Sequence, residues 1–188
     1  MFNEIFIDLG PNSFVLSSIV LPFSINALIA FIPTVICLFV SAFVSASEVA
    51  FFSLSPKDFE RMESENHSSD EKIKLLLQKP EHLLATILIT NNLVNVSIIV
   101  LSSYIINQTL NFSAFPILGF IFETVLITFI ILLVSEIMPK IFAQQHGLRM
   151  ARFGAGILKS LRSILKPFVW ILVSSTSVVN KCLAKHKH

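Results

Sequence analysis

The chain has 188 residues, of which 54% are hydrophobic and only 14% charged, with a formal net charge of +2 and a mean hydropathy of +0.77. This composition excludes an ordinary soluble protein, and the length allows one domain or two small ones. Asp, Glu, Lys and Arg are missing from two long stretches, between Asp8 and Glu48 and between Glu81 and Glu123. Roughly 20 residues of helix cross the hydrocarbon layer of a bilayer, so these stretches predict membrane spans.

Three spanning helices are predicted near residues 25–50, 83–105 and 115–138. Residues 1–24 come before them as an apolar and acidic segment that contains helix-breaking Gly and Pro. The fold class expected is therefore an all-α membrane protein, with a short N-terminal segment followed by one transmembrane domain over 25–188.

The segment between the first two spans, residues 53–82, is strongly charged. Ser55 and Pro56, followed by Asp58, are typical of a capped helix start with proline at the first helical position. The sequence NHSSDEK at 66–72 ends this helix and caps a second one. A helical hairpin outside the bilayer is therefore predicted.

The segment after the third span is basic, and two juxtamembrane helices are expected within residues 141–183. Five basic side chains share one arc of about 140° on a helical wheel: Arg149, Arg152, Lys159, Arg162 and Lys166. Such an amphipathic helix is expected to lie on the membrane surface, with its basic face on anionic lipid headgroups rather than on nucleic acid. Residues 167–180 are too short and polar for a fourth span, and a second interfacial or re-entrant helix is predicted there.

The basic residues also predict the orientation. All 14 Lys and Arg lie either in 57–79 or in 140–187. Because basic loops are retained on the cytoplasmic side, we expect an inner (plasma) membrane protein with its N-terminus outside and its hairpin and C-terminus in the cytoplasm.

Polar residues recur inside the predicted spans. Ser41 and Ser45 are four residues apart and share one face of the first span, and Asn91 and Asn95 do the same in the second. The third span ends with Glu136 at its apolar boundary. All three helices thus place oxygen atoms in their cytoplasmic halves, where we expect the side chains to meet.

Pro139 adds one more oxygen. A proline inside a helix has no N–H for the carbonyl four residues back, here that of Ser135, and such a carbonyl needs another partner at membrane depth. Hydroxyl, amide, carboxylate and carbonyl oxygens suit Mg²⁺ better than a metal that prefers thiol or imidazole. A Mg²⁺ site is therefore predicted, with Pro139 opening the helix. Its candidate ligands are Ser41, Ser45, Asn91, Asn95, Ser135 and Glu136.

A structural interpretation stays open beside the metal site. Ser and Asn in membrane helices often serve only as hydrogen-bonding links between helices, and Asn92, about 100° from Asn91 around the helix, is expected to serve packing. Glu136 could pair with Lys140 at the i+4 position. Glu123, roughly 20 Å farther along the third span, is expected to be structural.

Four stretches of the sequence resemble, in order, the transmembrane domain of the CNNM/CorC family of magnesium transporters. They are SAFVSASEVAFFSLS, PEHLLATILITNNLVNV, SEIMPKIFAQQHGLRMA and LKPFVWILVSS, and they cover roughly residues 36–180. The resemblance implies three spanning helices with a juxtamembrane helical belt, a homodimer, and a Mg²⁺ site open to the cytoplasm. It also implies Mg²⁺ export coupled to Na⁺ entry. Regulatory CBS and C-terminal domains are expected in full-length relatives and are not part of these residues.

Carried over position by position, the resemblance assigns the same serines, asparagines and acid, with the carbonyl at 135 as a further ligand. Two positions depart from the glycines that are usual in the family, namely Thr90 before the asparagines and Ser135 before the acid. Side chains there are expected to narrow the cavity or to add a ligand.

Two functions from different classes are therefore considered. The first is divalent cation transport, as Na⁺-coupled Mg²⁺ export. The second is a non-transporting membrane anchor or assembly subunit on the same fold, for example of a gliding or secretion apparatus, in which the polar residues only join the helices. An enzyme is not expected, because the sequence shows no activated nucleophile and no catalytic metal set.

Overall fold

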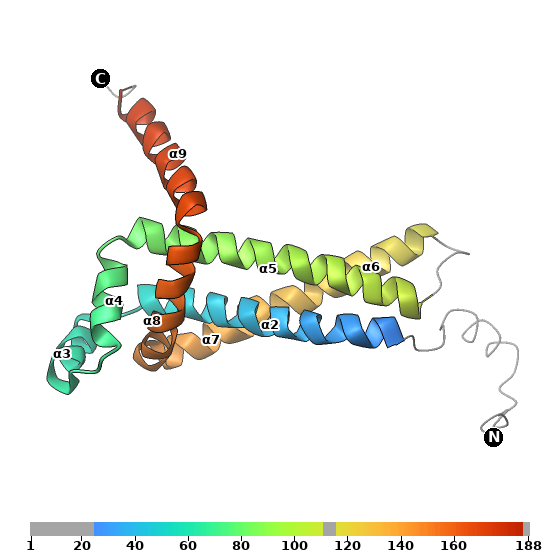
Figure 1. Cartoon of the computed structure of the whole chain (residues 1–188), viewed down its shortest axis with the longest axis horizontal. Helices are drawn as coiled ribbons and strands as arrows, with labels where there is room; N and C mark the ends of the chain where they lie inside the picture. The colour runs from blue at the N-terminus through green and yellow to red at the C-terminus, as the bar shows by residue number, and fades with distance from the viewer. Residues whose placement is uncertain (1–24, 111–115, 186–188) are drawn as a thin grey trace, which may run out of the picture.

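The computed structural model describes the backbone of residues 25–110 and 116–185, and the side chains of this part up to residue 175 (Figure 1). The predicted N-terminal segment, residues 1–24, lies outside the described residues. Every element in the described ranges is a helix, which confirms the all-α prediction.

Three helices of the described chain are long and apolar enough to cross a membrane, as predicted. The first two are α2 (Ile25–Phe52) and α5 (Pro80–Thr109). The third runs from α6 (Pro116–Ile130) through the π-helix η1 (Ile131–Ile137) into α7 (Met138–Gln145). All three extend along the long axis of the molecule (Figure 1). Many large apolar side chains of these three helices are exposed. Such exposure is expected for helices that face lipid.

The charged segment forms the predicted hairpin of α3 (Pro56–Glu65) and α4 (Asp70–Leu77) at one end of the spans (Figure 1). The backbone N–H of Ser55 donates to Asp58 Oδ2 at 2.8 Å, which fixes the start of α3. This bond and that from the Ser55 hydroxyl lower the pKa of Asp58. Helix α3 ends at Asn66, whose φ of 49° is left-handed, a conformation that asparagine tolerates better than most residues.

The last two helices are α8 (Gly147–Ile164) and α9 (Lys166–Lys185). Helix α8 packs on α2 through small side chains, and a Cβ atom added at Gly154 would lie 3.1 Å from Ser47 Oγ. Helix α9 leads away from the bundle at a steep angle to α5 (Figure 1). This arrangement agrees with the prediction that the segment does not form a fourth span.

Arg152, one of the five cations predicted to face lipid, instead pairs with two carboxylates of the hairpin. Arg152 donates to Asp70 through Nε and Nη2, at 2.8 and 3.0 Å, and to Glu65 through Nη1 at 2.6 Å. Because α8 lies against the hairpin, this part of its basic face is covered by α4. The hydrogen bond to Asp70 raises the pKa of Arg152. Burial would raise the pKa of Asp70, but hydrogen bonds from Arg152 and the His67 backbone outweigh it, so the pKa is lowered.

Two apolar clusters lie at different levels of the bundle. The larger one joins α2, α5, α7 and α8 to the hairpin, with Phe51, Met62 and Leu158 at its centre. The smaller one links α5 to the third span through Ile98, Ile127 and Ile131, with Leu38 of α2 packed against it. Of the polar residues predicted to bind a metal, Ser41 of α2 and Asn91 of α5 lie between these two levels.

Candidate ion-binding site

Ser41 is the centre of a hydrogen-bonded cluster between α2 and α5. Its hydroxyl lies 2.8 Å from Asn91 Oδ1 and 2.7 Å from Asn95 Oδ1. The Ser45 hydroxyl lies 3.5 Å from the same Asn91 oxygen. Both serines are fully buried and both asparagines are half-buried. The two pairs at i and i+4 therefore face each other, as the sequence predicted.

The third span joins this cluster through Glu136. The Asn95 side-chain amide donates to Glu136 Oε1 at 3.1 Å. All three spans thus contribute oxygen atoms to one connected group. We call this group the polar cluster, and its members are Ser41, Ser45, Asn91, Asn95 and Glu136.

Lys140 does not pair with Glu136, although their spacing made this a plausible alternative. Its Nζ lies 3.1 Å from Glu48 Oε2 at the end of α2. Glu136 has no ion-pair partner among the described residues. The hydrogen bond that its carboxylate accepts there comes from the neutral side-chain amide of Asn95. A carboxylate at membrane depth without a protein cation is costly unless another cation or a proton compensates its charge.

The backbone around Glu136 departs from the regular α-helix. Residues Ile131–Ile137 form a π-helix, and the N–H of Met138 donates to the carbonyl of Leu133, five residues back. Pro139 follows directly and offers no N–H to the Ser135 carbonyl. Single π-helical turns inside α-helices are frequent at functional sites.

Thr90 and Ser135, which stand where the family usually has glycine, do not donate hydrogen bonds from their hydroxyls to the polar cluster. The Ser135 hydroxyl donates to the Ile131 carbonyl and the Thr90 hydroxyl to the Thr86 carbonyl, both at 2.7 Å. Both side chains are buried. They therefore fill space on the inner faces of their helices, beside the cluster.

Asn92 and Glu123 lie apart from the polar cluster. Asn92 is exposed on the outer side of α5, and Glu123 is half-buried on α6, more than three helical turns before Glu136. Sequence reasoning did not find the π-helix or the pair of Glu48 with Lys140. A signal for the first was the proline four residues after Ser135. The second required the relative rotation of two helices, which the sequence does not give.

The chemistry of the cluster is that of neutral oxygen atoms around one carboxylate. No group of three or more His, Cys, Asp or Glu side chains able to hold a metal occurs in the described ranges. A resident zinc or iron site is therefore not supported there. Hydroxyl, amide and carboxylate oxygens can instead bind a hard cation such as Mg²⁺.

A family described as "Cyclin M transmembrane N-terminal domain", or CNNM, matches residues 32–188. A UPF0053 protein of Haemophilus influenzae is 37% identical over 142 residues, which cover 76% of this chain and 33% of that protein. The UPF0053 inner membrane protein YfjD of Escherichia coli is 28% identical over 144 residues, which cover 77% of this chain and 32% of the relative.

The match thus spans about a third of the length of these relatives. The family match includes the first span from residue 32 onward, the other two spans, the polar cluster and both juxtamembrane helices. This chain is therefore a member of the CNNM family and carries its transmembrane domain.

Proposed function

We propose that this chain is the membrane domain of a Mg²⁺ transporter that exports the ion from the cytoplasm, with Na⁺ entry supplying the energy. The observation that carries the proposal is the polar cluster. Oxygen atoms from three spans meet there, and its one carboxylate lacks a cationic partner in the described part of the chain. Membership of a transmembrane family supports the general class.

The donor set fits a transported ion better than a permanently bound one. Mg²⁺ takes about six oxygen ligands near 2.1 Å and often keeps several waters. Hydroxyl and amide oxygens with a single carboxylate would bind it moderately, which allows release. For the ion to enter, the Ser41 hydroxyl would turn its proton away from Asn91 and Asn95 and offer a lone pair.

The third span supplies a candidate for the moving part. The π-helix η1 and Pro139 interrupt the regular hydrogen bonding of this helix next to Glu136. Interruptions of this kind are where helices bend. We propose that α2 and α5 tilt against the third span at this point, which would expose the site to the two sides in turn.

The orientation and assembly belong to the same proposal. The basic residues favour a cytoplasmic hairpin and C-terminus, and the name of the Escherichia coli relative refers to the inner membrane. We propose that two copies form a homodimer in that membrane.

A second function is favoured by one specific observation. The Ser41 hydroxyl is already hydrogen-bonded to both asparagine oxygens, and the Asn95 amide already donates to Glu136. A cluster satisfied in this way can join helices without any ion, as in a membrane anchor or assembly subunit.

Mg²⁺ binding to the purified protein, measured by isothermal titration calorimetry, tests the site. Asn91→Ala and Glu136→Ala should abolish binding, because each removes an oxygen ligand. Asn92→Ala is the matched control, since this neighbouring amide is exposed outside the cluster, and it should bind like the parent. Unchanged binding in both site variants would refute the assignment.

Ion flux separates the two functions. Proteoliposomes with and without a Na⁺ gradient should move Mg²⁺ only if the chain transports, and Glu136→Ala should stop the movement. Where the isolated domain binds Mg²⁺ but moves none in either condition, the anchor is the better description.

A further inference from the structure

A large cavity lies where α4, α5, α8 and α9 meet, away from the polar cluster. Its volume is about 920 Å³. Gln78 and Lys79 line it just before α5, and His82 lines it from the first turn of α5, which is also the start of the second span. The cavity therefore lies at the boundary between the charged hairpin and the membrane.

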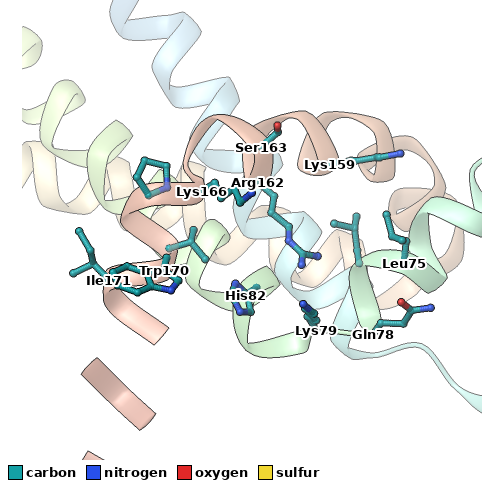
Figure 2. A pocket seen from close by; sticks show the side chains of 13 residues that line it. Leu75, Gln78, Lys79, His82, Lys159, Arg162, Ser163, Lys166, Trp170 and Ile171 are labelled. Carbon is teal, nitrogen blue, oxygen red and sulfur yellow. The ribbon is translucent and has the colours of Figure 1, made fainter. Parts of the chain in front are cut away.

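The cavity carries a positive charge that the described protein does not neutralise. Lys79, Lys159, Arg162 and Lys166 line it, and no Asp or Glu does. The ion pairs of the described residues involve other cations, such as Arg152 on the same helix. In Figure 2, the Arg162 side chain extends from α8 towards His82 of α5 and Lys79, the residue before α5. An anion held here would have donors on two sides.

Most of the rest of the wall is apolar. Leu76 and Val169 form a buried part of it, while Trp170 and Ile171 of α9 are exposed beside the charges (Figure 2). A second cavity of about 270 Å³ lies between α5 and α9, where Leu84, Ala85, Leu88, Leu172 and Val173 line it together with Glu81. A ligand that matches both parts has an anionic head and hydrocarbon chains.

We propose that this cavity binds an anionic phospholipid. Its phosphate would contact Arg162, Lys159 and Lys166, and its acyl chains would pass Trp170 towards the leucines of the smaller cavity. Basic pockets beside transmembrane helices are known sites for anionic headgroups. A soluble phosphate compound would use the cations but not the apolar wall, which is why a lipid is the better match. The proposal does not depend on Mg²⁺ transport.

Trp170 makes the site measurable, because it is the only tryptophan of the chain. The purified protein is placed in phosphatidylcholine vesicles that contain phosphatidylglycerol with brominated acyl chains, which quench tryptophan on contact. We expect half-maximal quenching at a mole fraction about fivefold lower than with phosphatidylcholine brominated at the same positions, since several basic side chains add to the attraction. Equal quenching by the two lipids would overturn the proposal.

Two variants of equal charge separate the pocket from general surface attraction. Lys159→Gln/Arg162→Gln/Lys166→Gln should bring the preference for phosphatidylglycerol close to one. Lys57→Gln/Lys72→Gln/Arg149→Gln removes the same charge outside the cavity and should keep the preference. If this control loses the preference equally, charge alone attracts the lipid and the pocket assignment is wrong.

Two further measurements complete the test. Quenching by brominated phosphatidylcholine should be the same in the pocket variant as in the parent, which shows that Trp170 keeps its place; where it is not, the single variants Arg162→Gln and Lys166→Gln are used, and each should lower the preference. Soluble glycerol phosphate at millimolar concentration should not relieve the quenching. Relief of the quenching by this compound would mean that the cavity binds a soluble phosphate compound rather than a lipid.

Discussion

Two regions of this protein hold carboxylates in hydrogen-bonded groups, and they differ in the source of the compensating charge. At the hairpin, Arg152 brings a full positive charge to Asp70 and Glu65. Between the spans, the hydrogen bond that Glu136 accepts within the described residues comes from the neutral amide of Asn95. The nearby Lys140 forms its ion pair with Glu48 instead. A group that contains its own cation is suited to fix a structure. A group that lacks one is suited to take a cation from solution.

The largest effect on stability is expected at the hairpin. Asp70 is almost fully buried, with 6% of its side chain exposed, so Arg152→Ala would leave an unpaired carboxylate in place. Removing one partner of a buried pair costs on the order of 3 kcal/mol. The melting temperature in detergent, followed by scanning fluorimetry, should fall by several degrees, whereas Mg²⁺ affinity should stay within about twofold at a temperature where the variant is folded.

Arg152→Lys serves as the control for this prediction. It keeps the charge but loses the two-pronged geometry, so its melting temperature should lie between those of the parent and the alanine variant. Should Arg152→Ala also remove Mg²⁺ binding from folded protein, the two regions are coupled and the contrast between them does not hold.

A smaller effect is expected for Ser41→Ala in the polar cluster. The change leaves the Asn95 side-chain oxygen without its donor and leaves Asn91 only the longer contact with Ser45. Hydrogen bonds between membrane helices contribute about 1 kcal/mol. Ser47→Ala is the matched control on the same helix, because the buried Ser47 hydroxyl only donates to the Phe43 carbonyl of its own helix.

The two serine variants separate the ion site from simple helix packing. Both should lose little stability, but only Ser41→Ala should weaken Mg²⁺ binding, by at least about tenfold for a lost ligand. If calorimetry shows the same affinity for both variants, Ser41 is a link between helices and not a ligand.

The sequence predicted the fold well because membrane helices depend on local composition. Long uncharged stretches such as 25–47 must be helical in lipid, where the backbone has no other way to satisfy its hydrogen bonds. The hairpin was predictable for a similar reason, since Ser55, Pro56 and Asp58 act within one turn. The exact helix ends extended beyond the apolar stretches, because a helix can continue in water after it leaves the membrane.

The candidate site was predictable only in part. The spacing of Ser41 with Ser45 and of Asn91 with Asn95 gives a shared face on each helix, and contact between the faces followed once the helices were paired. The partner of Lys140 and the inward turn of Arg152 depend on how separate helices are rotated and packed. Spacing along one helix cannot provide that information. The charged cavity was missed for the same reason, because its walls come from four helices.

The smallest effect over the physiological range is expected for pH, and its direction follows from the lowered pKa of Asp70. A carboxyl group that binds protons more weakly in the folded state contributes its full stability above its ordinary pKa, here about 3.8, and loses it as the pH falls through the folded value. The melting temperature of the parent should therefore change little through this group between pH 7 and about 4.5 and fall below about pH 4. In the same acidic window, the difference in melting temperature between the parent and Asp70→Asn should become smaller.

Mg²⁺ connects this titration to the contrast between the two regions. A ligand that binds only the folded protein stabilises it by mass action, so saturating Mg²⁺ should raise the melting temperature of the parent at pH 7. It should not change the difference between the parent and Asp70→Asn at any pH, because that carboxylate already has Arg152 as its partner. A difference that disappears when Mg²⁺ is added at pH 7 would mean that the ion acts at the hairpin, and the acids of the two regions could no longer be assigned separate roles.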